Sequence, residues 1–165
     1  MEYEDLYSGY AEWRDWAYSD DELFDECEKL IKQYGDNGWV IAYNGIFRNG
    51  QAEKADKGEW LRKSIPIIRK CLSIIPLLVI TTKSKALVNS YGLKHRLEDT
   101  LVENYVSNGE AIIAMLLLGF RVSLPEPSRR GSINCNFFCK YAQNDFMVRN
   151  ESRCGIAYSS LIFRL

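Results

Sequence analysis

The chain has one histidine, His95, which lies in the stretch SYGLKHRLED with carboxylates three and four residues after it. On a helix, Glu98 or Asp99 would share a face with His95 and could orient its imidazole, as an acid–base dyad requires. The same spacing also arises in ordinary surface ion pairs, and the sequence has neither a second histidine nor a nucleophile motif of the G-x-S-x-G type. The pattern keeps an enzyme open as a hypothesis but favours a protein that is not an enzyme.

Five cysteines form a second group of potentially reactive residues: Cys27, Cys71, Cys135, Cys139 and Cys154. Cys135 and Cys139 could place two thiolates side by side, with Cys154 as a third ligand. Structural zinc sites usually combine two C-x-x-C pairs, or one pair with two histidines, and the sequence contains neither. We therefore expect buried thiols, with no metal and no other cofactor. An odd cysteine count without a secretion signal also favours a reducing, cytoplasmic location.

Charge is distributed unevenly along the chain, although the net charge is only −1. Residues 1–28 carry eleven acidic residues and one basic residue, whereas residues 29–165 carry twenty basic and eleven acidic residues. This division indicates an acidic segment that could lie on a basic body or meet a basic partner. A solvated helix without a partner would give the same pattern. The acidic candidates for partner binding are Asp20, Asp21, Glu22, Asp25 and Glu26.

Basic side chains gather near the middle of the chain, where Lys85 precedes the sequence Lys94-His95-Arg96. We expect these residues to share the exposed side of a helix, with tyrosines nearby that could stack on bases while the basic groups contact phosphates. A further basic pair lies in a loop after two prolines. The basic candidates for partner binding are Lys94, His95, Arg96, Arg129 and Arg130.

Residues 85–119 have the outline of a helix-turn-helix. Ser107 and Glu110 form an S-x-x-E capping box at the start of its second helix, which we expect to run to Gly119. A helix that reads DNA must offer polar side chains to base edges, but this one reads EAIIAMLLLG and is apolar on all sides after Glu110. We therefore predict a hairpin that is buried in the core and does not read DNA.

Two earlier segments carry strong local signals. Ser19 and Glu22 form another capping box, and the apolar spacing from Leu23 to Tyr34 predicts a helix that has an acidic outer face and stops at Gly35. The dipeptide Asn44-Gly45 then predicts the turn of a β-hairpin.

The segments between and after these elements read less clearly. Residues 49–58 are typical of a polar loop, and 59–75 of a helix that Pro66 starts or kinks and Pro76 ends. Residues 77–82 fit either a strand or the end of that helix. Strands are also predicted at 133–139 and 156–165.

The mixture predicts an α+β fold, in which helices pack on short antiparallel strands. Length and composition favour one globular domain over residues 1–165, with 1–28 as its acidic N-terminal segment. The longest apolar run, Ala111 to Leu118, is too short to span a bilayer, and the first residues lack the apolar core of a signal peptide. We expect a cytoplasmic protein without a membrane partner.

Three blocks resemble a recurrent pattern in small uncharacterised proteins of phages, plasmids and integrative elements: SYGLKHRLE at 90–98, YVSNGEAIIAMLLLGF at 105–120 and INCNFF at 133–138. The resemblance implies a mobile-element setting and a cytoplasmic location in the host cell. Proteins of this size in that setting commonly act by binding nucleic acid or a host defence complex, as anti-CRISPR-like inhibitors do.

The favoured hypothesis is a non-enzymatic inhibitor or adaptor that binds a host protein or nucleoprotein complex through its acidic segment. One alternative is a protein that binds DNA or RNA through the basic surface around Lys94–Arg96. Another is a small enzyme that uses His95 with a nearby carboxylate. The aromatic stretch YAEWRDWAY adds the hypothesis of a homodimer.

Overall fold

The computed structural model describes residues 19–82, 85, 87–101, 104–125 and 133–142. Its helices are α2 (Asp20–Asp36), the short 3-10 helix η1 (Asn49–Lys54), α3 (Leu61–Leu78), α4 (Ser90–Thr100) and α5 (Asn108–Leu117). Its strands are β1 (Trp39–Ala42), β2 (Gly45–Arg48), β3 (Val79–Thr81), β4 (Val88–Asn89), β5 (Val122–Ser123), β6 (Asn136–Phe137) and β7 (Cys139–Tyr141). The fold is α+β, as the sequence predicts.

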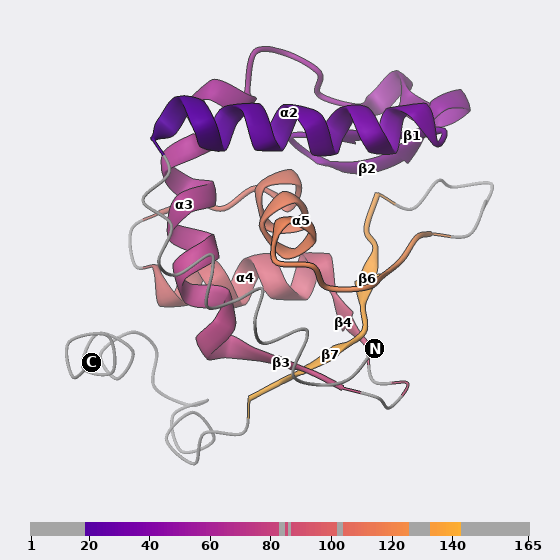
Figure 1. Ribbon diagram of the computed structural model, residues 1–165. Coiled ribbons are helices and arrows are strands. Elements are labelled where there is room, and N and C mark those ends of the chain that lie inside the picture. The colour runs from indigo at the N-terminus through magenta and orange to yellow at the C-terminus, as the bar shows by residue number, and fades with distance from the viewer. Residues whose placement is uncertain (1–18, 83–84, 86, 102–103, 126–132, 143–165) are drawn as a thin grey trace.

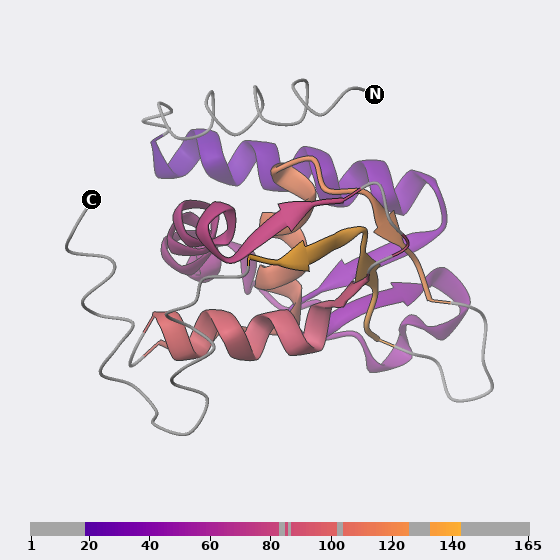
Figure 2. The ribbon, with the colours of Figure 1, turned by 90° about the horizontal axis from the view of Figure 1, so that it is seen from below.

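Helix α5 lies at the centre of this arrangement. It packs against α2, α3, α4 and the β1–β2 hairpin, which surround it in Figure 1. Figure 2 shows α5 running between α2 and α4, with strands crossing in front of it. Its residues Asn108 to Met115 are all buried, because a helix that is apolar around its circumference is stable only where every side is covered. The predicted burial of this helix is confirmed.

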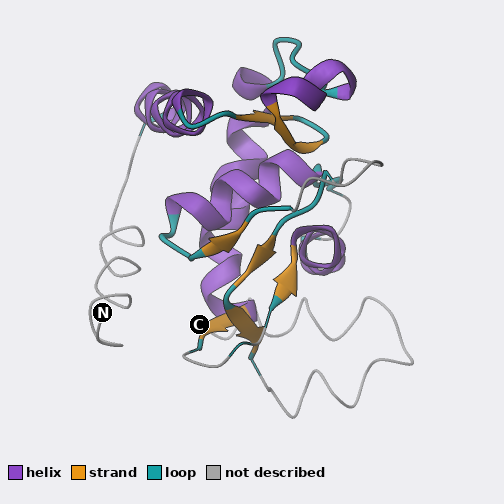
Figure 3. Ribbon diagram, turned by 90° about the vertical axis from the view of Figure 1, so that its right-hand side faces the viewer, coloured by secondary structure: helices purple, strands orange, loops and turns teal. Residues whose placement is uncertain are grey.

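The strands form small antiparallel sheets that are separate from one another (Figure 3). Strands β1 and β2 make a hairpin, β3 pairs with β7, and β6 lies between β4 and β5. Phe137 on β6 faces both Val88 and Val122, so the late strand joins two earlier segments of the chain. The predicted strand at 156–165 lies outside the described residues.

Helix α2 begins as predicted. The hydroxyl oxygen of Ser19 accepts from the Glu22 backbone N–H at 3.2 Å, and the Glu22 carboxylate accepts from the Ser19 backbone N–H at 2.8 Å. The predicted stop at Gly35 is wrong, because the helix continues to Asp36 and the left-handed residue is Gly38, with φ of +89°. The chain must turn at Gly38 because β1 begins at the next residue.

The β1–β2 hairpin is confirmed, but its turn residues differ from the prediction. Ala42 pairs with Gly45, so the turn consists of Tyr43 and Asn44, and Gly45 is the first residue of β2. Gly45 has φ of +152°, and a Cβ there would collide with the backbone oxygen of Ile133. The glycine is therefore required by close packing of the hairpin as well as by its own backbone angle.

Three boundary predictions around α3 and α5 are wrong in detail. Residues 49–58 contain η1, and α3 runs to Leu78 with both Pro66 and Pro76 inside it. Pro76 lies in the last turn, where buried neighbours hold the helix together although a backbone donor is missing. Residues 77–82 therefore divide between the end of α3 and β3. Helix α5 ends at Leu117, two residues before Gly119, whose φ of +81° turns the chain away.

Among the described residues, no helix combines the length and the apolar character that crossing a membrane requires.

A substitution at Gly109 tests how closely the β1–β2 turn packs on the first turn of α5. A Cβ at this position would collide with the backbone oxygen of Ala42 and lie 2.8 Å from that of Tyr43. We expect Gly109→Ala to lower the free energy of unfolding by about 2 kcal/mol or more, because backbone cannot move aside cheaply. Urea denaturation measures the change.

Gly35→Ala is the matched control, since Gly35 also lies in a helix but has no atom within 4 Å of the added Cβ. This variant should raise stability by about 0.5–1 kcal/mol through helix propensity. Equal effects of the two substitutions would contradict the close packing at Gly109.

Candidate functional site

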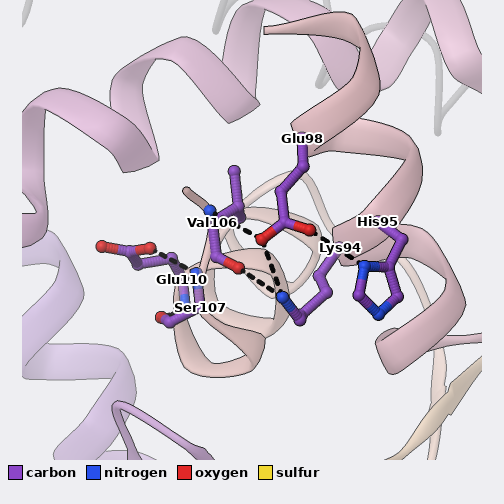
Figure 4. Close-up of polar contacts among 6 residues, drawn as sticks. All are labelled: Lys94, His95, Glu98, Val106, Ser107 and Glu110. Atoms are coloured by element: carbon purple, nitrogen blue, oxygen red, sulfur yellow. Dashed lines mark hydrogen bonds and ion pairs between the residues drawn. The ribbon is translucent and has the colours of Figure 1, made fainter. Parts of the chain in front are cut away.

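Lys94 does not lie on an exposed basic surface, and that prediction is wrong. Its side chain is 7% exposed, and its ammonium group donates to Glu98 Oε1 at 2.8 Å and to the backbone oxygen of Val106 at 3.1 Å (Figure 4). The ammonium also lies 4.5 Å from the ring centroid of Tyr105. A long side chain on a short amphipathic helix has thus turned inward to join α4 to the segment that leads into α5.

Glu98 holds this junction together. Its Oε1 also accepts from the Val106 backbone N–H at 3.2 Å, and its Oε2 lies 2.9 Å from His95 Nδ1. Burial by itself would raise the pKa of Glu98, but the hydrogen bonds from Lys94, Val106 and His95 and the charge of Lys94 outweigh it and hold that pKa below its ordinary value. The carboxylate therefore stays ionised in the folded protein near neutral pH.

His95 is paired with Glu98, one of the two carboxylates that the sequence offered, whereas Asp99 points to solvent on the exposed side of α4. The imidazole is about half exposed and meets the ring of Tyr91 edge-on, with the centroids 4.6 Å apart. A His–Glu pair can support proton transfer. Here, however, the carboxylate is shared with Lys94 and a backbone N–H, and Figure 4 shows Glu110 on the far side of Val106 from His95.

Where the structure describes them, the remaining basic candidates differ in how far they are exposed. Arg96 is partly buried, with its guanidinium 5.2 Å from the ring centroid of Tyr141, and Lys85 is exposed. Arg129 and Arg130 lie outside the described residues. The tyrosines proposed to stack on bases are thus engaged in part by the protein's own cations, Lys94 on Tyr105 and Arg96 on Tyr141.

The acidic candidates lie on the outer face of α2, as predicted, and several have partners within the protein. Asp21 pairs with Arg62 and Asp20 with Arg69, and these pairs attach the start of α2 to α3. Glu22 caps its own helix, and Glu26 pairs with Lys29. Asp25 is exposed and makes no ion pair with any described residue, which also holds for Glu28 one turn along the helix.

An open cleft of about 440 Å³ was not anticipated from the sequence. Tyr43 of the hairpin turn, Trp60 at the start of α3 and Tyr105 before α5 contribute aromatic rings to it. The rings of Tyr43 and Trp60 meet edge-on with centroids 5.8 Å apart. The charged residues of the lining are Asp56, Glu59, Lys63 and Glu110. His95 does not line this cleft.

Glu110 both caps the N-terminus of α5 and lines this cleft. Its residue is 3% exposed, and its Oε2 accepts from the Ser107 backbone N–H at 2.7 Å, which completes the capping box of α5. No described base lies within ion-pair distance of its carboxylate. Burial raises the pKa of Tyr43, and the nearby carboxylates of Glu110 and Asp56 raise it further, together with Tyr105. The charged side chains of the lining are thus three carboxylates, Asp56, Glu59 and Glu110, and one ammonium group, Lys63.

The cysteines of the described residues are buried thiols. Burial raises the pKa of Cys27, Cys135 and Cys139 to about 12 and places that of Cys71 well above its usual range. Thiols that resist ionisation are poor nucleophiles and poor metal ligands. Within the described ranges, no three cysteine, histidine or acidic side chains come together as a metal site would require. Cys154 lies outside these ranges.

Comparisons of the chain with protein-family models, with curated proteins and with solved structures gave no match.

The buried pair of Lys94 and Glu98 gives a test of the junction between α4 and α5. We expect Glu98→Gln to lower the free energy of unfolding by about 3 kcal/mol, because it leaves the buried ammonium of Lys94 without its counter-charge. Lys94→Met should cost less, because Glu98 is partly exposed and keeps His95 and the Val106 N–H as partners. The double variant should lose less than the sum of the two. Urea denaturation of the four proteins at neutral pH gives the coupling energy, and strictly additive losses would contradict the pairing.

The same pair predicts a dependence on pH. Because the pKa of Glu98 is lower in the folded than in the unfolded protein, its contribution is complete above the ordinary value of 4.5 and is lost as pH falls through the lower folded value. The wild-type protein should therefore lose stability below about pH 4.5 more steeply than Glu98→Gln. Thermal unfolding over the acid range measures both curves, and parallel curves would exclude the effect.

Proposed function

We propose that this protein is a non-enzymatic binding protein that contacts a basic surface of a partner through the outer face of α2. In the mobile-element setting that the sequence blocks suggest, the partner is a host protein or nucleoprotein complex, and binding inhibits or adapts it in the host cytoplasm. The observation that carries the proposal is the concentration of exposed carboxylates on the first half of α2, where Asp25 and Glu28 have no ionic partner among the described residues.

The packing of α2 supports this role, because its buried residues Leu23 and Cys27 fix the helix on the core and two exposed ion pairs add to that contact. Arg62 and Arg69 of α3 hold Asp21 and Asp20 at the start of α2, and Arg62 also lies over the ring of Phe24. The carboxylates that follow are thereby presented on a helix whose position is set before binding. Such preorganisation lowers the cost of association, and complementary charge accelerates encounter.

The two alternatives have weaker support. Binding of nucleic acid through Lys94–Arg96 would need these side chains on the surface, but Lys94 is buried against Glu98 and Arg96 is partly covered by Tyr141. An enzyme that uses His95 is favoured only by its hydrogen bond to Glu98. His95→Gln separates that idea from the binding role, since full biological activity of this variant would exclude a catalytic histidine.

Asp25 and Glu28 provide the direct test of the binding role. A photoreactive amino acid at position 25 should capture a partner in a lysate of host cells, and the captured species is then purified and its affinity measured. The pair Asp25→Asn and Glu28→Gln should weaken that affinity by about tenfold at low salt, with less difference at high salt because screening removes the contribution of the charges.

Asp99→Asn is the matched control, because Asp99 is also an exposed helical acid but lies on α4. It should leave the affinity unchanged. Equal affinity of the Asp25/Glu28 variant and wild type across the salt series would contradict the proposal, and so would the same loss with Asp99→Asn.

A further inference from the structure

The aromatic cleft brings together residues that are distant in sequence and that recognise one kind of ligand. Tyr43, Trp60 and Tyr105 supply three rings, and Glu110 supplies a buried carboxylate at the same cavity. The faces of aromatic rings carry partial negative charge and attract cations, and a carboxylate in a partly desolvated position strengthens that attraction. The same chemistry already operates beside the cleft, where the ammonium of Lys94 lies 4.5 Å from the ring centroid of Tyr105.

The charges of the lining have the sign that such a ligand needs. Asp56, Glu59 and Glu110 face a single base, Lys63, whose flexible and exposed side chain can leave the cavity. A phosphate-bearing ligand would be repelled by the three carboxylates, although its base could stack on the rings. An uncharged apolar ligand would gain from the rings but would leave Glu110 without a counter-ion.

We propose that this cleft is a binding site for an organic cation, an alkylammonium or guanidinium group held against the rings of Tyr43, Trp60 and Tyr105 with Glu110 as its counter-ion. The group belongs either to a free small molecule or to a lysine or arginine side chain of a partner. The volume of about 440 Å³ is ample for one such group and lies within the range of small-ligand pockets.

The cleft is separate from the acidic face of α2. Trp60, Lys63 and Ile67 recur at helical spacing along one side of α3, whereas Arg62 and Arg69, which hold the start of α2, lie about half a turn away on the other side. Cation binding by the purified protein therefore goes beyond the proposed function and does not depend on it. Failure of one test leaves the other standing.

The experiment follows the indole N–H signal of Trp60 by NMR, assigned by its loss in Trp60→Phe. The probes are choline, the uncharged carbon isostere of choline, agmatine, and arginine with both backbone ends blocked. Choline and agmatine should shift the Trp60 signal saturably, and the isostere should bind at least about fivefold more weakly. Binding of blocked arginine as tight as that of agmatine indicates a side chain of a partner, whereas a preference for the free cations indicates a small molecule.

Two substitutions that should change the affinity for choline in opposite directions locate the site. Glu110→Gln keeps a residue that can complete the capping box but removes the charge, and should weaken choline binding by about tenfold. Lys63→Gln removes the competing ammonium, and should strengthen binding about twofold to threefold. Glu22→Gln makes the same change in the capping box of α2, outside the cleft, and should leave the affinity for choline unchanged.

Unfolding curves establish that each variant is folded before its affinity is compared. If Glu110→Gln does not fold, Tyr105→Ala replaces it, because that side chain is 63% exposed and its ring lines the cleft. The proposal is overturned if the isostere binds as tightly as choline, if neither Glu110→Gln nor Tyr105→Ala weakens binding, or if the Trp60 signal does not move with any cation.

Discussion

The burial of the N-terminus of α5 is the constraint on which the rest of the structure depends. A helix covered on every side cannot leave its first backbone N–H groups to water, so each must find a partner inside the protein. Ser107 Oγ accepts from the Glu110 N–H at 3.1 Å, and the backbone oxygen of Tyr43 accepts from the Gly109 N–H at 2.9 Å. The Asn108 side chain donates to the backbone oxygen of Ile133 at 3.1 Å. The first turn of α5 thus fixes the β1–β2 turn and the segment at Ile133 that leads into β6.

The same constraint positions two groups of polar residues beside the start of α5. Glu110 must be a capping residue within the core, and because the hairpin turn packs beside it, Tyr43 is brought to the same place. On the other side of Val106, Lys94 and Glu98 clamp the chain that leads into the helix. Tyr105 is held between the two, next to Lys94 and at the mouth of the cleft. The start of α5 therefore places Tyr43, Tyr105 and Glu110 at the cleft, whereas α3 and the loop before it supply the rest of the lining.

Local signals predicted the elements well where the cause is local. The capping boxes at Ser19 and Ser107 and the apolar circumference of α5 each depend on a few neighbouring residues, and all are confirmed. Two positions were misjudged because their surroundings come from distant parts of the chain. Gly45 is required by contact with Ile133 and lies in a strand, not in the turn, and Lys94 points inward to a glutamate and a backbone oxygen. The cleft could not be found from the sequence, because Tyr43, Trp60 and Glu110 meet only in the folded chain.

The basic residues of α3 are divided between the two surfaces that we propose for recognition, the outer face of α2 and the aromatic cleft. Both are acidic, and they lie on opposite sides of α3, whose bases are divided between them: Arg62 and Arg69 pair with α2, whereas Lys63 lines the cleft. Both arginines form ion pairs with the first two residues of α2, so they do not neutralise the carboxylates farther along that helix. A chain with a net charge of only −1 thereby keeps two strongly negative regions. A partner that contacts both surfaces would need a basic group for each of them.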